Sequence, residues 1–191
     1  MVLVNEHSLQ CQKNIKKGFY VRFFPLLLAL SLSLIASPKE INTFNGKFVQ
    51  TIVDDSGKKI VYSGELWASK PQNALWLYQK PIQKSVYINA QKITVIEPSI
   101  EQVTLRNLDS EIDFLTIIQK AKQIDETRYS ATVKGQIYTI TFKNDLLSTI
   151  HYTDSFDNRV TIHFTNPTQN RSIDAGKFKP VIPQDYDLIK G

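Results

Sequence analysis

The chain has 191 residues, of which 42% are hydrophobic and 21% charged, and this composition is typical of one globular domain with a sizeable core. Residues 1–36 hold four of the 23 Lys and Arg and one of the 18 Asp and Glu, which leaves 19 basic and 17 acidic residues, a net charge of +2, in residues 37–191. That remainder has no basic run with interleaved aromatics, which argues against a nucleic-acid partner.

A basic lead followed by an apolar run opens the chain. Lys13, Lys16, Lys17 and Arg22 precede the run 23–36 (FFPLLLALSLSLIA), and the chain turns polar at Ser37. This order is typical of a secretory signal peptide. A run of 14 residues is short for a bilayer span, so a cleaved signal is favoured over a retained anchor. We expect residues 1–36 to be a signal peptide and 37–191 the exported domain.

Ten short segments of alternating apolar and polar residues follow, and most of their connections contain Asp, Asn, Gly, Ser or Pro. Period-two alternation between such turns predicts β-strands. The segments are 44–53, 59–68, 74–80, 84–89, 92–97, 101–106, 128–134, 136–143, 146–153 and 159–165. Ten strands joined by short connections predict an antiparallel meander that must curl or close.

One helix is expected between these strands, over residues 110–122 (SEIDFLTIIQKAK). Asp109 or Ser110 can cap its first turn. Apolar residues then fall on one stripe at helical spacing, namely Phe114, Ile117, Ile118 and Ala121. This stripe would cover an apolar face of the sheet.

Some of the predicted strands are apolar on both faces. Ala74, Trp76 and Tyr78 share one face, whereas Leu75 lies on the other. A sheet that is apolar on both faces needs cover on both, or a ligand on one. Trp67, Trp76 and Tyr78 therefore have two interpretations, as core aromatics or as the wall of a ligand site.

Residues of the kind that enzymes use are sparse. His151 and His163 lie mid-strand and face the same way, without a carboxylate at ligand spacing beside them. The carboxylate pairs at 54/55 and 154/157 fall in predicted turns, where Asp is favoured by local backbone hydrogen bonds. Cys11 lies in the predicted signal, so the exported domain has no thiol. A histidine pair and a glycosidase-type carboxylate pair stay minor alternatives, and we expect no enzyme, no metal and no cofactor.

Several segments carry recognisable motifs in order along 43–189. They are Thr43–Gln50 (TFNGKFVQ), Gly64–Pro71 (GELWASKP) with the aromatic strand Ala74–Tyr78, Glu97–Val103 (EPSIEQV), Asp154 with Asn158, and Asp174–Phe178 before Pro180 and Pro183. This set resembles the periplasmic outer-membrane lipoprotein carrier family, the LolA-like proteins. The first two resemble the family's Phe-x-x-x-Phe-x-Gln strand and Gly-x-Leu-x-x-x-(Arg/Lys)-Pro hairpin, and the last resembles its closing strand.

The resemblance implies a mainly β fold, an unclosed antiparallel barrel of about 10–11 strands with a helical lid over an apolar cavity. It implies a monomeric periplasmic chaperone that shields the acyl chains of lipoproteins. The chaperone would load from an inner-membrane ABC-type release complex and deliver to an outer-membrane acceptor. The candidate lipid-binding residues are Trp67, Ala74, Trp76, Tyr78, Val86, Ile88, Ile93 and Val95, and the candidate lid residues are Lys70, Phe114, Ile117 and Ile118.

The sequence departs from the family pattern at two positions. Lys70 stands where the family often has an Arg that tethers the lid, and lysine lacks the planar fork of arginine. Ala74 stands where a bulky aromatic is common. Two other functions stay open: a lipid-binding or envelope-stress-sensing domain of the same fold that does not ferry cargo, and a secreted hydrolase.

Overall fold

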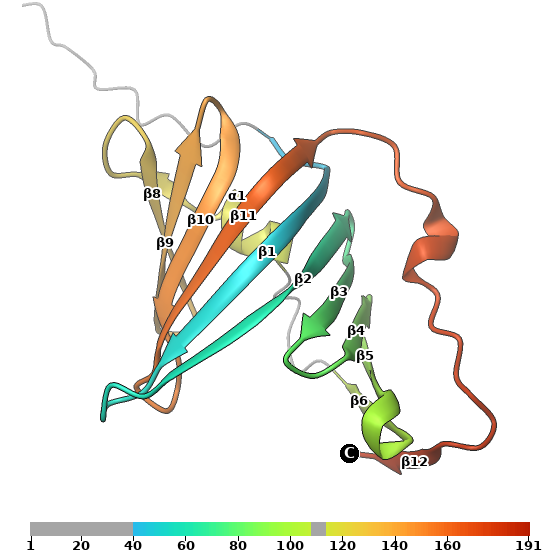
Figure 1. The fold of residues 1–191 in the computed structure, drawn as a ribbon. Helices are drawn as coiled ribbons and strands as arrows, with labels where there is room; N and C mark the ends of the chain where they lie inside the picture. Colours follow the sequence, from blue (N-terminus) through green and yellow to red (C-terminus); the bar gives the residue numbers. More distant parts are fainter. Residues whose placement is uncertain (1–39, 108–113) are drawn as a thin grey trace, which may run out of the picture. The chain divides into compact units, whose positions relative to one another are not determined.

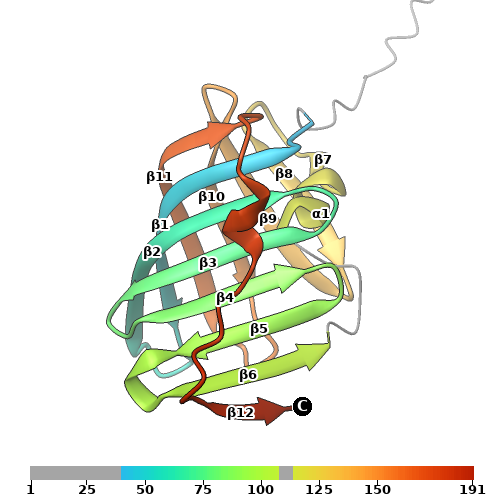
Figure 2. The same cartoon turned by 90° about the vertical axis from the view of Figure 1, so that its right-hand side faces the viewer.

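Twelve strands form one sheet that curls around a short helix (Figures 1 and 2). The computed structural model describes residues 40–107 and 114–191. The predicted signal peptide, and the first four residues of the predicted helix, lie outside the described residues. Within the two described ranges, no helix is long and apolar enough to cross a membrane.

The strands match the ten predicted segments closely, with two more at the ends of the sheet. They are β1 (Thr43–Val53), β2 (Lys59–Ser69), β3 (Asn73–Lys80), β4 (Lys84–Asn89), β5 (Lys92–Glu97), β6 (Gln102–Asn107), β7 (Lys122–Gln123), β8 (Arg128–Val133), β9 (Gln136–Lys143), β10 (Leu146–Thr153), β11 (Arg159–Gln169) and β12 (Asp187–Lys190). The remaining elements are α1 (Phe114–Gln119) and the 3₁₀-helices η1 (Pro98–Ile100) and η2 (Ala175–Phe178).

The order across the sheet is β12-β6-β5-β4-β3-β2-β1-β11-β10-β9-β8-β7. Neighbours pair antiparallel, except β12, which pairs parallel with β6. The end strands β12 and β7 do not pair with each other among the described strands, so the sheet is unclosed. The prediction of a mainly β, unclosed antiparallel sheet with a helix is confirmed, and the described residues form twelve strands rather than 10–11.

Two hairpin turns are held together by the side chain of an Asp at their start. Asp54 Oδ1 accepts hydrogen bonds from Ser56 Oγ (2.7 Å) and Lys58 N (2.8 Å) in the β1–β2 turn. In the β10–β11 turn, Asp154 accepts from Phe156 N (2.9 Å) and from the Asn158 backbone and side chain (3.0 and 2.9 Å). These hydrogen bonds stabilise the charged carboxylates and hold the pKa of Asp54 and of Asp154 below the ordinary value.

Most of the core lies on the face of the sheet that α1 covers, which we call the inner face. Phe114 of α1 packs against Phe44 of β1 and Phe164 of β11, with ring centroids 5.2 and 5.8 Å apart. Leu115 and Ile118 of α1 are buried beside them. The helix thus closes the inner face over the middle strands of the sheet.

The opposite, outer face is covered in part by residues 170–186, which we call the C-terminal strap. The strap crosses β2 to β6 before the chain joins the sheet as β12 (Figure 2). Phe178 of η2 is buried, and its carbonyl accepts a hydrogen bond from Asn89 Nδ2 on β4. Leu75, Ile96 and Val103 are buried on this face. The outward apolar residues of β3, β5 and β6 therefore belong to a second packed layer.

Two expectations from the sequence are wrong. Asp174–Phe178 is not the closing strand: its last four residues form η2, in which Lys177 N donates to Asp174 O (3.0 Å) and Lys179 N donates to Gly176 O (3.1 Å). The closing strand is β12. The helix ends at Gln119 rather than near 122, because Lys122 and Gln123 pair with β8 as β7.

Candidate functional site

The inner face of β3, β4 and β5 carries two rows of apolar side chains. In one row, Trp76 lies opposite Val86 and Val86 opposite Val95. The other row contains Ala74, Ile88 and Ile93, which are opposed in the same way. The structure thus brings together all the predicted lipid-binding residues of these three strands on one face, and Tyr78 extends the surface at the end of β3.

This part of the inner face is less closed than the part beneath α1. Trp76, Val86, Ile88, Ile93 and Val95 are half-buried, whereas Phe44 and Phe48 of β1 are almost fully buried. Half-buried apolar side chains on neighbouring strands form a continuous apolar surface that solvent or a ligand can reach. Ala74 differs from its neighbours because it is 1% exposed and belongs to the packed core.

Aromatic rings link this open surface to the core. Phe48 meets Trp76 and Tyr78 edge to face, with both centroid distances at 5.2 Å. Trp76 also meets Phe114 of α1 at 5.9 Å. Edge-to-face pairs at these distances are favourable. They hold one flank of Trp76 in place while leaving the side chain only half-buried.

Trp67 does not join the other predicted lipid-binding residues. It pairs with Leu75 in the β2–β3 register, and both side chains lie on the outer face, since side chains alternate along a strand. The Nζ atom of Lys177, in the C-terminal strap, stands 3.9 Å from the Trp67 ring centroid. Trp67 therefore packs under the strap, and it is not part of the inner-face surface.

The predicted lid residues lie on α1 and at the end of β2. Phe114 and Ile118 are buried against the sheet, and Ile117 packs at the edge of the same cluster. Lys70 Nζ forms an ion pair with Glu40 Oε1 at 2.9 Å. Within the described ranges Lys70 forms this one ion pair, which joins the end of β2 to the segment before β1 and not to α1.

Polar groups border the apolar surface toward the β1–β2 hairpin. Tyr78 donates a hydrogen bond to Gln50 Oε1 at 3.2 Å, and Lys84 Nζ stands 4.9 Å from the Tyr78 ring centroid.

Tyr152 of β10 also lies on the inner face. Burial raises the pKa of Tyr152 to about 12, so its phenol stays neutral at physiological pH. Gln50 stands in the sequence only as the last residue of the Phe-x-x-x-Phe-x-Gln motif, and no sequence motif points to Tyr152. The signal for Gln50 was its place in strand alternation with Phe48 and Ile52, which puts all three on the inner face.

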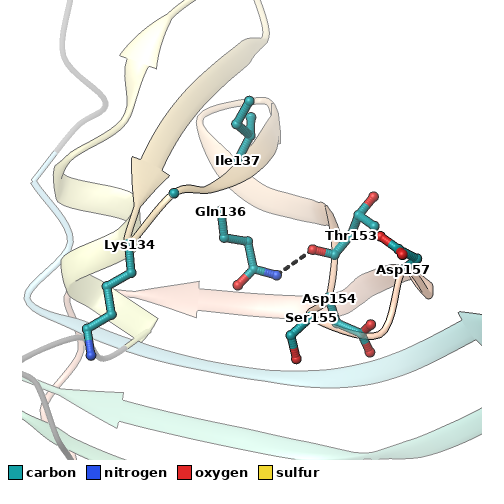
Figure 3. Close-up of a pocket in the computed structure, with 8 residues that line it drawn as sticks. Lys134, Gln136, Ile137, Thr153, Asp154, Ser155 and Asp157 are labelled. Atoms are coloured by element: carbon teal, nitrogen blue, oxygen red, sulfur yellow. Dashed lines mark hydrogen bonds between the residues drawn. The ribbon is translucent and has the colours of Figure 1, made fainter.

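A separate hollow of about 510 Å³ lies between the β8–β9 and β10–β11 turns (Figure 3). Gln136 Nε2 donates to the carbonyl of Thr153 there, and Asp154 is engaged in its own turn. His151 and His163 are exposed on the outer face, where each ring contacts a threonine hydroxyl. No group of three or more His, Cys, Asp or Glu among the described residues is placed to hold a metal ion.

Known proteins with a similar sequence or fold agree with this architecture. Residues 39–181 match the family model described as outer membrane lipoprotein carrier protein LolA. The chain belongs to this family. An outer-membrane lipoprotein carrier protein of Campylobacter jejuni is 35% identical over 177 residues, which cover 92% of this chain and 99% of the relative. Another protein of that name, from Wolinella succinogenes, is 32% identical over 171 residues, or 89% of this chain and 99% of the relative.

A solved structure of a conserved protein from Thermus thermophilus has the same fold, with a TM-score of 0.50. It is 9% identical, and the match covers 78% of this chain and 91% of that one. The description of the LolA family names lipoprotein carrier proteins. The inner face of β3 to β5 is accordingly a candidate binding surface and not a candidate active site.

Proposed function

We propose that this protein binds the acyl chains of lipoproteins on the inner face of β3 to β5 and carries them through the periplasm. The observation that supports this most is the row Trp76, Val86 and Val95, which is apolar and half-buried, whereas α1 covers the middle strands and the C-terminal strap lies on the opposite face. An apolar surface left open beside a closed core is suited to an apolar ligand.

The magnitude of the hydrophobic effect explains why such cargo needs a carrier. Each CH₂ group removed from water contributes about 0.8 kcal/mol, so acyl chains of roughly 16 carbons amount to tens of kcal/mol. The carrier must shield most of that surface and still release it. Many weak, non-directional contacts along two open rows meet both needs better than a tight polar site.

Membership of the family supports a proposal for the route of the cargo. We propose that residues 1–36 direct export and are removed, and that residues 37–191 act as a monomer in the periplasm. The monomer would receive acylated lipoproteins from an inner-membrane ABC-type release complex and pass them to an outer-membrane acceptor. Intact-mass analysis of periplasmic protein tests the first step: we expect a mass that lacks the leader, and recovery of the full-length chain in the inner membrane would contradict it.

The binding claim is tested by purifying the protein from the periplasm and identifying co-purified lipoproteins by mass spectrometry. We expect acylated lipoproteins with the wild type and few or none with Val95→Asp, because a carboxylate on the inner face opposes burial of an acyl chain. Val49→Asp is the matched control, since Val49 is 41% exposed on the outer face of β1. Equal recovery from Val95→Asp and Val49→Asp would place binding elsewhere.

A further inference from the structure

Polar side chains on the inner face lie beside the open apolar surface, on the strands next to it. Gln50 of β1 is half-buried between Phe48 and Ile52, which share its face. Across the register, Gln50 lies opposite Tyr62 of β2. The rings of Tyr62 and Tyr78 are 5.8 Å apart, edge to face. Gln50 is thus an amide among apolar and aromatic side chains, with the Lys84 ammonium over the neighbouring Tyr78 ring.

The hydrogen bond between Gln50 and Tyr78 orients the amide. Tyr78 donates to Gln50 Oε1, so Gln50 Nε2 is left with its two N–H groups as donors. In the part of the chain that the structure describes, Nε2 has no hydrogen-bond partner. A ligand that accepts hydrogen bonds therefore meets an amide N–H₂ here.

A second donor faces the same region from β10. Tyr152 lies on the inner face, opposite Val160 of β11, which in turn lies opposite Ile52 of β1. Its ring packs against Tyr138 at 5.1 Å. Its hydroxyl, like Gln50 Nε2, has no hydrogen-bond partner within the described ranges. Burial raises the pKa of Tyr78, and the Tyr152 phenol adds to that rise.

The chemistry of these donors narrows the ligand. Both are neutral, and a neutral N–H or O–H suits a neutral carbonyl oxygen; anionic groups are more strongly held by charged donors. The surrounding rings and aliphatic side chains suit hydrocarbon. A ligand that offers carbonyl oxygens at the head of long apolar chains fits both parts, and acyl esters of glycerol have this arrangement.

We infer that Gln50 and Tyr152 bind the ester carbonyl oxygens of the cargo's diacylglyceryl group, so that the inner face distinguishes acyl esters from hydrocarbon of the same length. The inference rests on the proposed function and adds a specificity to it. The apolar rows of β3 to β5 bind any long acyl or alkyl chain. The two donors add affinity only for a ligand with ester carbonyl oxygens, so they set the preference for an ester over an ether. The ester preference is then worth about one or two net hydrogen bonds.

The test compares two synthetic lipopeptides that share an N-palmitoyl cysteine. One carries an S-dipalmitoylglyceryl group with two ester carbonyls, and the other an S-dihexadecylglyceryl ether that lacks them. Affinities are measured for the wild type, Gln50→Met, Tyr152→Phe and Tyr87→Phe. Tyr87 is the matched control because it pairs with Leu75 on the outer face. Both inner-face substitutions keep the size of the side chain and remove its donor.

We expect the wild type and Tyr87→Phe to prefer the ester probe, and Gln50→Met and Tyr152→Phe each to lose about five-fold of that preference, the factor of one net hydrogen bond. Binding of the ether probe should be unchanged in all four proteins. Equal affinities of the wild type for both probes, or an equal loss for both probes in the variants, would overturn the inference. Failure of the wild type to bind either probe would instead contradict the proposed function, and this inference with it. Tyr152→Phe decides the question if Gln50→Met does not fold.

Discussion

Trp67 and Trp76 lie on neighbouring strands, one register position apart, and their side chains point to opposite faces of the sheet. Trp67 stacks under Lys177 of the C-terminal strap, and Trp76 meets Phe48 and Phe114 on the inner face. The two indoles therefore report on two separate environments of one small sheet. A ligand on the inner face should affect Trp76 and leave Trp67 unchanged.

Replacing Trp76 by Ala should reduce acyl-chain binding more than it reduces stability. Truncating a fully packed aromatic to Ala costs about 3–5 kcal/mol, but a half-buried side chain already lacks partner atoms on one flank and should lose less. Phe178→Ala is the opposite case, because Phe178 belongs to the strap and is only 4% exposed. We expect Phe178→Ala to lower the free energy of unfolding by about 3–5 kcal/mol and to leave binding of a fluorescent acyl probe intact. Denaturant unfolding and probe titration of both variants check the pair, and a reversed pattern would contradict the assignment of the two faces.

Gly64→Ala should destabilise the sheet where β2 approaches β3. A Cβ at Gly64 would fall inside contact distance of the Leu77 backbone carbonyl and 3.0 Å from Cε1 of Phe48. Because backbone atoms cannot move aside as a side chain can, we expect a loss of about 1–3 kcal/mol in the free energy of unfolding. Ser63→Ala, one residue earlier on the same strand, is the control and should stay near wild type. Denaturant midpoints measure both.

The stability of the protein should fall above pH of about 10 in a way that depends on Tyr152. Burial raises the pKa of Tyr152 to about 12 in the folded protein, whereas an unfolded tyrosine titrates near 10. The folded state thus holds this proton more tightly, and the associated stability is fully present below pH of about 10 and is lost as the pH rises toward 12. Tyr152→Phe should flatten this loss. Unfolding midpoints between neutral and alkaline pH test it, and identical slopes for both proteins would refute it.

Lys70→Leu should behave like Glu40→Gln. Their ion pair is 2.9 Å long, but Glu40 is 72% exposed, so its loss should change the free energy of unfolding by less than about 1 kcal/mol. A direct role for Lys70 in tethering α1, which the family resemblance predicts, would make Lys70→Leu alone change the rate of cargo transfer to acceptor membranes. We expect the two variants to transfer cargo at the same rate, as the observed pair with Glu40 indicates.

Strand positions were predictable because local signals specify them. Period-two alternation and turn residues such as Asp54 and Asp154 placed ten of the twelve strands within a few residues. The two missed strands have no such signals. β7 is two residues long, and β12 is an exposed four-residue strand that pairs with β6, a strand far away in the sequence (Asp187 lies opposite Gln102). Pairings of this kind depend on the tertiary fold and leave little pattern in the sequence.

The candidate site was predictable where strand alternation decides the face. Trp76, Val86 and Val95 fall on one face because the three strands pair in register without a bulge between these positions. Trp67 was predicted to bind lipid because it is aromatic. Its neighbours Leu66 and Ala68 face inward, however, and strand alternation puts Trp67 on the outer face. Gln50 appeared only as the last residue of a motif, because the role of a polar residue on an apolar face depends on its partner, Tyr78, two strands away.

The central claim is that acyl chains lie on the inner face of β3 to β5, and quenching of single tryptophans tests it most directly. Two variants are prepared, Trp67→Phe, which keeps Trp76, and Trp76→Phe, which keeps Trp67. Each is titrated with a triacylated lipopeptide whose acyl chains carry bromine, a quencher that acts at short range. The account predicts strong quenching of Trp76 and little or none of Trp67. Strong quenching of Trp67 with Trp76 unaffected would place the cargo under the strap and contradict it.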